Sequence, residues 1–181
     1  ATFYNCTGLV SVTLPQDLKV IDDYMFYKCS SLLSIKIPDG VTKIGRSAFY
    51  ECMKLLQVVI PNNVESIGDY AFYGCTRLSE LTVEENSEVT SIGEWAFYNT
   101  LLNSPKPTDS RKNPMLFPNL VTIGASAFKN VKNNFVYFSI PKSVKTIGDA
   151  AFAESSKLTT VDMAEDIQLE SMGEGVFENC S

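Results

Sequence analysis

The sequence predicts an α/β solenoid, a right-handed superhelix of about seven to eight coils with a parallel β-sheet on one face and short helices or 3-10 turns on the other. Three observations predict it. A phenylalanine-centred motif recurs at intervals of 23 to 31 residues. Each full copy contains a short stretch of alternating apolar and polar residues, and apolar residues at helical spacing follow it. Units of this length bury their apolar faces only by stacking on neighbouring units.

The repeats align on one phenylalanine in each unit. These anchors are Phe3, Phe26, Phe49, Phe72, Phe97, Phe128, Phe152 and Phe177. In stacked coils, equivalent positions of neighbouring units lie above one another. We therefore expect the rings to form one continuous hydrophobic column.

A short strand is predicted in each full unit, ending at a proline in most of them. In "LLSIKIP", residues 32–38, Ile35 and Ile37 fall on one side of an extended chain and Ser34 and Lys36 on the other. Proline ends the strand because it has no N–H for a further ladder bond. These segments are expected to form the parallel sheet, with their apolar side chains facing inward.

A short helix is predicted after each strand. Ile67, Ala71, Phe72 and Cys75 are spaced as one face of a helix. Gly68 and its equivalents precede this segment, and an aspartate replaces the glycine in one unit, which indicates an N-cap. An acidic residue usually follows, where the helix dipole favours negative charge.

The longest interval, 31 residues between Phe97 and Phe128, indicates an insertion. A strand is restored at "PMLFPNL", residues 114–120, with Phe117 facing inward. The polar residues 103–113 are therefore expected to form an inserted loop rather than to mark a lost repeat. Insertions in solenoids map to loops, and such loops often carry binding residues.

The whole chain, residues 1–181, is interpreted as a single repeat domain. It begins and stops within a repeat unit, and neither end has the polar cap that terminal repeats of solenoids carry. We therefore expect an excerpt of a longer surface protein, or ends that are frayed or capped by self-association.

The composition argues against catalysis and against nucleic-acid binding. The sequence has no histidine, which excludes Ser-His-Asp and Cys-His catalysis, and its five cysteines form no C-x-x-C pair. A net charge of -6 disfavours a nucleic-acid partner. No apolar run approaches the roughly 20 residues that span a bilayer. We expect no catalytic residues, no cofactor, no metal site and no membrane insertion by this chain.

Two further positions that recur in successive units can each be interpreted in two ways. One holds the cysteines Cys6, Cys29, Cys52, Cys75 and Cys180. A structural role for a small buried side chain is expected there, and a redox or bridged role is the alternative. The other column holds the tyrosines Tyr4, Tyr27, Tyr50, Tyr73 and Tyr98. This ladder either packs against the core or binds a sugar or protein.

The repeat unit carries a specific resemblance. "SIGDYAFYGCTRLSEL", together with the proline-ended strand "VVIPNNV", resembles the leucine-rich repeats of the BspA-like surface proteins. The pattern I-G-x-x-A-F-x-x-C-x-x-L-x-x-I-x-I-P recurs in register from Phe3 to Cys180. The resemblance implies a leucine-rich-repeat solenoid. It also implies a secreted or surface-anchored adhesin that binds host matrix proteins or other cells, with its signal and anchor outside this chain.

A binding surface is expected on the outward strand positions and the inserted loop, because the scaffold does not dictate those residues. The candidate ligand-binding residues are Lys36, Gln57, Val59, Glu80, Thr82, Tyr137, Ser139, Lys106, Arg111 and Lys112. The last three make the loop locally basic, which suits an acidic partner. A solvated sheet and an unselected loop are the alternatives.

The expected function is a non-enzymatic binding module for a host matrix protein, a cell-surface protein or a glycan, acting through the concave sheet face and the loop. The alternative is a passive spacer that displays another domain at the cell surface. Because function depends on sites carried by the scaffold, the repeat pattern by itself does not separate the two.

Overall fold

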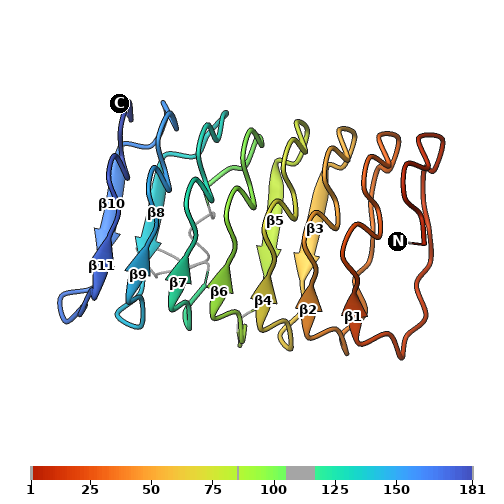
Figure 1. The fold of residues 1–181 in the computed structure, drawn as a ribbon, viewed down its shortest axis with the longest axis horizontal. Coiled ribbons are helices and arrows are strands. Elements are labelled where there is room, and N and C mark those ends of the chain that lie inside the picture. The colour runs from red at the N-terminus through yellow and green to blue at the C-terminus, as the bar shows by residue number, and fades with distance from the viewer. Residues whose placement is uncertain (1, 85, 105–116, 181) are drawn as a thin grey trace.

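The chain folds into coils stacked along one axis. The structure is a computed structural model that describes residues 2–84, 86–104 and 117–180. The coils lie side by side along the long axis, and the two termini lie at opposite ends of the stack (Figure 1). Each coil contributes parallel strands that pair with those of neighbouring coils.

The longest sheet is built from only two residues per coil. In spatial order its strands are β1 (Val20–Ile21), β2 (Lys43–Ile44), β4 (Ser66–Ile67), β6 (Ser91–Ile92), β7 (Thr122–Ile123), β9 (Thr146–Ile147) and β11 (Ser171–Met172). All neighbours are parallel. The sequence did not predict this sheet, because two residues are too few to show an alternating pattern.

Four of the predicted strands form the other sheets. They are β3 (Gln57–Ile60), paired with β5 (Glu80–Val83), and β8 (Tyr137–Ile140), paired with β10 (Thr160–Met163). In β3 the predicted alternation is confirmed, since Val58 and Ile60 are buried while Gln57 and Val59 are exposed. The strand predicted at 32–38 is reduced to a single bridge from Ser34 to Gln57. Residues 117–120 form no strand, and the rest of the strand predicted at 114–120 lies outside the described residues. Within the described residues the expected single sheet is divided into two pairs.

The predicted helices are absent from the described residues. The N–H groups of Tyr70, Phe72 and Gly74 donate to carbonyls of the next coil, at 2.7, 2.7 and 2.9 Å. An α-helix would instead need these groups to bond within their own segment. Tyr70 and Gly74 also have left-handed backbone, with φ of 56° and 67°. The segment is therefore a series of turns that bond from coil to coil.

The glycine column is not a row of helix caps. A Cβ on Gly68 would lie 2.8 Å from the backbone carbon of Gly45, and one on Gly124 would lie 2.5 Å from that of Gly93. The N–H of Gly68 also donates to the Ile44 carbonyl at 2.8 Å. Glycine is required here because the backbones of neighbouring coils approach one another too closely for a side chain.

The acidic residue after the glycine is structural in some coils, but not through a helix dipole. Asp69 Oδ1 accepts a hydrogen bond from the Glu94 N–H at 2.9 Å, and Asp149 Oδ1 accepts one from Glu174 at 2.9 Å. Each aspartate therefore ties its coil to the next.

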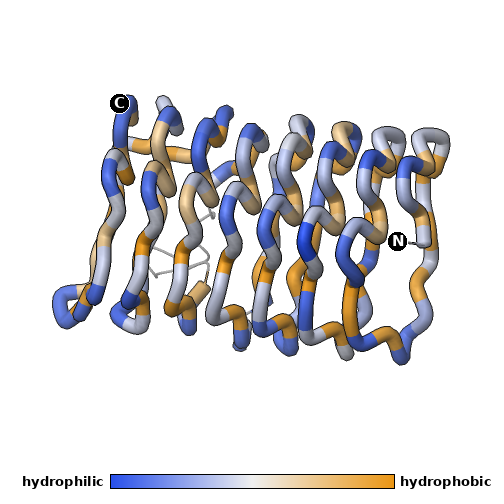
Figure 2. The backbone as a smooth tube through the Cα atoms, viewed as in Figure 1, coloured by the Kyte–Doolittle hydropathy of each residue, from blue (hydrophilic) through white to orange (hydrophobic). Residues whose placement is uncertain are grey.

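The predicted phenylalanine column is confirmed. All eight anchor rings stack from Phe3 to Phe177, with centroids 5.1 to 5.5 Å apart and planes within 20°. The six inner rings are fully buried. Phe117 is also buried, as predicted, where the described chain resumes. Apolar residues recur at corresponding places of successive coils (Figure 2).

Candidate functional site

Five of the predicted ligand-binding residues gather around β3 and β5. The parallel register places Gln57 beside Glu80 and Val59 beside Thr82, and all four side chains are exposed. Lys36 is exposed in the preceding coil, whose Ser34 forms a bridge to Gln57.

Val59 belongs to an exposed aliphatic row whose other three members sequence reasoning missed. Val10, Leu33 and Leu56 are 50%, 41% and 40% exposed. Their coils are adjacent, because the Leu33 N–H donates to the Val10 carbonyl at 3.0 Å and the Leu56 N–H to the Leu33 carbonyl at 3.2 Å. Leu56 directly precedes β3, where Val59 is 46% exposed. We call these four residues the aliphatic row.

The sequence contains a pattern that could have identified Leu33 and Leu56 as exposed. Leu33 and Leu56 each follow another leucine, and only the first leucine of each pair is buried. The equivalent position of the next coil is Ser79, whose N–H donates to the Leu56 carbonyl at 3.0 Å. The fold therefore accepts a polar residue where the chain has leucine.

The predicted residues Tyr137 and Ser139 lie on β8 and are half-buried. Tyr137 Oη donates to Asp162 Oδ2 at 3.2 Å, and its backbone N–H donates to Ser104 Oγ at 2.7 Å. Partial burial raises the pKa of Tyr137, and the nearby Asp162 carboxylate raises it further. Tyr137 therefore holds the chain in place next to the insertion.

The basic loop residues Lys106, Arg111 and Lys112 lie outside the described residues. The described chain stops at Ser104, whose N–H donates to the Asn134 carbonyl at 3.0 Å. Asn103 donates to Ser79 on the other side, at 3.1 Å. Asn103 and Ser104 thus lie between the coil of β5 and the coil of β8.

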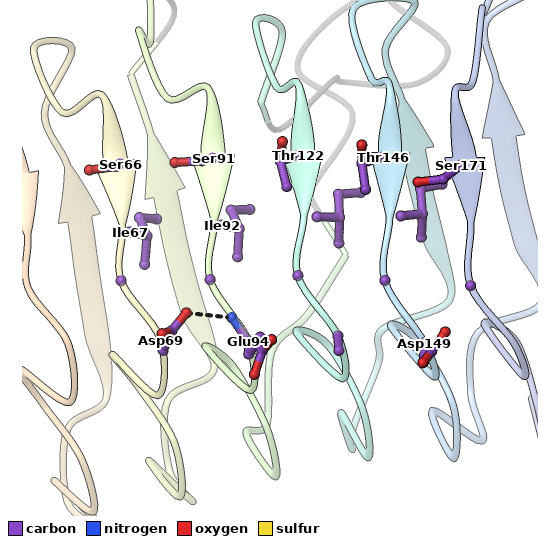
Figure 3. Close-up of a pocket in the computed structure, with 18 of the residues that line it drawn as sticks. Ser66, Ile67, Asp69, Ser91, Ile92, Glu94, Thr122, Thr146, Asp149 and Ser171 are labelled. Atoms are coloured by element: carbon purple, nitrogen blue, oxygen red, sulfur yellow. Dashed lines mark hydrogen bonds between the residues drawn. The ribbon is translucent and has the colours of Figure 1, made fainter.

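A second surface, a groove of about 700 Å³, crosses the seven-stranded sheet from β4 to β11. One side is a hydroxyl row of Ser66, Ser91, Thr122, Thr146 and Ser171. Next to them the lining contains Ile67, Ile92, Ile123, Ile147 and Met172, followed by a row of glycines, Gly68, Gly93, Gly124, Gly148 and Gly173. Beyond the glycines stand the carboxylates of Asp69, Glu94 and Asp149, which we call the acidic wall (Figure 3).

The cysteine column is structural where it is buried. Cys52 and Cys75 are free thiols whose Sγ atoms donate to phenylalanine carbonyls of the preceding coil, both at 3.1 Å. Burial raises the pKa of both thiols, which keeps them protonated as donors. Ser155 makes the same bond to Phe128 at 2.7 Å. The position therefore favours a small hydrogen-bond donor as well as a small side chain.

The tyrosine ladder is a packed stack. The rings from Tyr4 to Tyr98 lie 4.7 to 4.9 Å apart with planes within 24°. Sugars bind aromatic residues through the ring face, and in a continuous stack each inner face is covered by its neighbour. The ladder therefore presents ring edges and hydroxyls rather than a sugar platform.

The described part of the chain contains neither a metal-binding cluster nor a membrane-spanning helix. No group of three or more Cys, Asp or Glu side chains there is placed to hold a metal ion. The same residues include no helix long and apolar enough to cross a membrane.

Comparison with known proteins identifies the repeat. The chain matches the BspA type leucine rich repeat region, with six copies over residues 1–113 and 121–181. The chain belongs to this family. Six matched copies do not confirm the seven to eight coils expected from the sequence. Leucine-rich repeats are in general non-enzymatic scaffolds for protein interaction.

Solved structures show the same fold. A leucine-rich repeat protein from Eubacterium ventriosum ATCC 27560 has a TM-score of 0.62 and 23% identity, and the match covers 87% of this chain and 38% of that one. The T. pallidum leucine-rich repeat protein has a TM-score of 0.67 and 21% identity, over 94% and 76% of the two chains. This BspA-type chain thus spans well under half of the first protein. No curated protein matches it.

Proposed function

We propose that this BspA-type repeat chain is a non-enzymatic binding module that attaches to a partner protein at the cell surface or outside the cell. The observation that carries the proposal is the aliphatic row. Four exposed aliphatic side chains in neighbouring coils lie beside Lys36, Gln57, Glu80 and Thr82. An apolar centre with a polar and charged rim is the usual composition of a protein interface.

A protein partner suits this surface better than a glycan does. Exposed aliphatic side chains bind by removing apolar area from water, which a matching apolar patch on a protein provides. Asn103, which precedes the inserted loop, bonds to Ser79 next to β5. Lys106, Arg111 and Lys112 of that loop are proposed as an accessory contact for an acidic part of the same partner. The family resemblance supports surface display, and the partner is proposed to be a host matrix or cell-surface protein.

The test replaces the aliphatic row without altering the fold. Leu33→Ser/Leu56→Ser introduces the residue that Ser79 already provides in the next coil. Binding to a panel of purified extracellular-matrix proteins is measured by surface plasmon resonance. We expect the double variant to bind about tenfold more weakly, or worse, because each leucine would be an interface anchor.

The matched control is Met53→Ser, which removes an exposed apolar side chain, 44% exposed, outside the row. It should keep the affinity of the parent chain. If the parent binds no protein of the panel, the chain is better described as a passive spacer. If the double variant binds as the parent does, the aliphatic row is not the interface and this proposal is wrong.

A further inference from the structure

The groove across the seven-stranded sheet is a second binding surface, separate from the aliphatic row. We propose that it binds an extended basic segment of a protein, which lies along the stack axis with Lys or Arg side chains paired to the acidic wall of Asp69, Glu94 and Asp149. The proposal rests on charge, on the shape of the groove and on what the fold does not require.

The acidic wall forms no ion pair in the described part of the chain. The residues that line the groove include three carboxylates and no lysine or arginine. Asp69 and Asp149 each use only Oδ1 in a backbone hydrogen bond, so Oδ2 is left for a ligand. A ligand that complements the charge of the groove is therefore positively charged.

Cations close to the groove in the described residues do not pair with the acidic wall. Lys43 lies beside Ser66 on the side of the hydroxyl row, and Lys145 pairs with Glu170 at 2.7 Å. Arg46 occupies the position equivalent to Asp69 one coil earlier, and its guanidinium lies over the Tyr70 ring, 5.6 Å from the centroid. Lys129 lies 5.8 Å from the Trp95 centroid and pairs with Glu154 at 3.2 Å. Arg46 and Lys129 therefore form no ion pair with the acidic wall.

The shape of the groove suits an extended backbone. The isoleucines that line it are buried, so they do not fill it, and Met172, in β11 at one end of the groove, is the exposed apolar residue of the lining. The hydroxyls opposite the wall both donate and accept, which matches peptide N–H and C=O groups of any sequence. They make no hydrogen bond to another residue in the described ranges. The hydroxyl row would hold the backbone while the acidic wall selects the side chains.

The spacing of the wall defines the ligand further. The groove crosses five strands, which at ~4.8 Å per strand is about 19 Å, or about six extended residues. Asp69 and Asp149 are three coils apart, about 14 Å. In an extended peptide, side chains four residues apart point the same way at about 13 Å. Two basic residues with this separation would reach both aspartates.

The fold does not account for the whole wall. The coil-to-coil bond explains Asp69 and Asp149, but the Glu94 carboxylate accepts no hydrogen bond from a described residue. Ala125 occupies the same position in the next coil. The scaffold thus tolerates a neutral residue where the groove has a charge.

The test uses a fluorescein-labelled octapeptide of alternating serine and arginine, which places every arginine on one side when extended. Fluorescence anisotropy measures its binding to the whole chain and to Asp69→Asn/Glu94→Gln/Asp149→Asn. Asparagine Oδ1 still accepts the backbone hydrogen bond, so the variant loses charge and keeps the coil contacts. We expect the parent to bind and the variant to bind about tenfold more weakly or worse.

The control is Asp17→Asn/Asp39→Asn/Glu165→Gln, which removes three exposed carboxylates outside the groove. It should bind like the parent, and so should Leu33→Ser/Leu56→Ser, because the aliphatic row lies elsewhere. Equal weakening of binding in the groove variant and this control would indicate general charge attraction and overturn the proposal. Absence of binding by the parent would also overturn it.

Discussion

Gly124 shows how tightly neighbouring coils are packed. A Cβ at this position would lie 2.5 Å from the carbonyl carbon of Gly93 and 2.6 Å from the Glu94 nitrogen. These are backbone atoms held by the coil-to-coil hydrogen bonds, such as that from the Gly124 N–H to the Ile92 carbonyl at 2.8 Å. A methyl group therefore has no flexible neighbour to displace.

We expect Gly124→Ala to lower the free energy of unfolding by about 1–3 kcal/mol, because the backbones of two coils must separate. Gly8→Ala is the matched control, since nothing lies within 4 Å of a Cβ there, and it should change stability by less than about 0.5 kcal/mol. Urea unfolding followed by circular dichroism measures both. Equal effects would contradict the close approach of the coils.

Some residues of the candidate site could be predicted from the sequence and others could not. Alternation identified Gln57 and Val59 as outward-facing, because the inward positions of β3 are consistently apolar. Leu33 and Leu56 were missed, because apolar residues are assigned to the core unless a neighbour already fills that place. The acidic wall was assigned to a helix dipole, since sequence alone does not show which backbone an aspartate contacts.

At the scale of elements, the turn segments explain why a helix was predicted. Ile67, Ala71, Phe72 and Cys75 all face the core, and their spacing fits 3.6 residues per turn. Left-handed residues alternate with inward-facing ones in the same segment and produce a similar spacing without a helix. Hydrophobic periodicity indicates which residues are buried but not the backbone conformation. A helix and the observed series of turns would bury the same residues of this segment.

The tyrosine ladder, one such turn column, predicts a stability change at alkaline pH. Burial first, and then the Glu51 carboxylate, raises the pKa of Tyr50 from 10.0 to about 12. The folded chain thus retains a proton that the unfolded chain loses, and the stabilisation is present below pH 10 and lost as the pH rises toward 12. Tyr50→Phe keeps a ring in the stack but cannot titrate.

We therefore expect the parent to lose more stability than Tyr50→Phe between pH 9 and 11.5, because only the parent titrates at this position. Urea unfolding at several pH values measures the difference between the two chains. Using the difference removes the contribution of the buried thiols, which both chains share. Parallel pH curves would contradict the assigned pKa shift.

At the scale of the whole molecule, the phenylalanine column makes the stability depend on position along the stack. The sequence predicted this column because one ring recurs in every unit, which is a long-range signal that no local pattern disturbs. Each coil contacts only its neighbours, so an inner ring packs against two others and a terminal ring against one. Phe72 lies between Phe49 at 5.1 Å and Phe97 at 5.2 Å and is fully buried.

Phe72→Ala should therefore lower the free energy of unfolding by about 3–5 kcal/mol, because it leaves a cavity that stacked coils on both sides cannot close. Phe177 is the matched position at the end of the column, half-buried and stacked only on Phe152 at 5.5 Å. Phe177→Ala should cost about 1–2 kcal/mol, since only part of the ring leaves a buried environment. Urea unfolding followed by far-UV circular dichroism measures both variants. Equal losses at the two positions would mean that the rings do not act as one column, and that the coils are held together mainly by their backbone ladders.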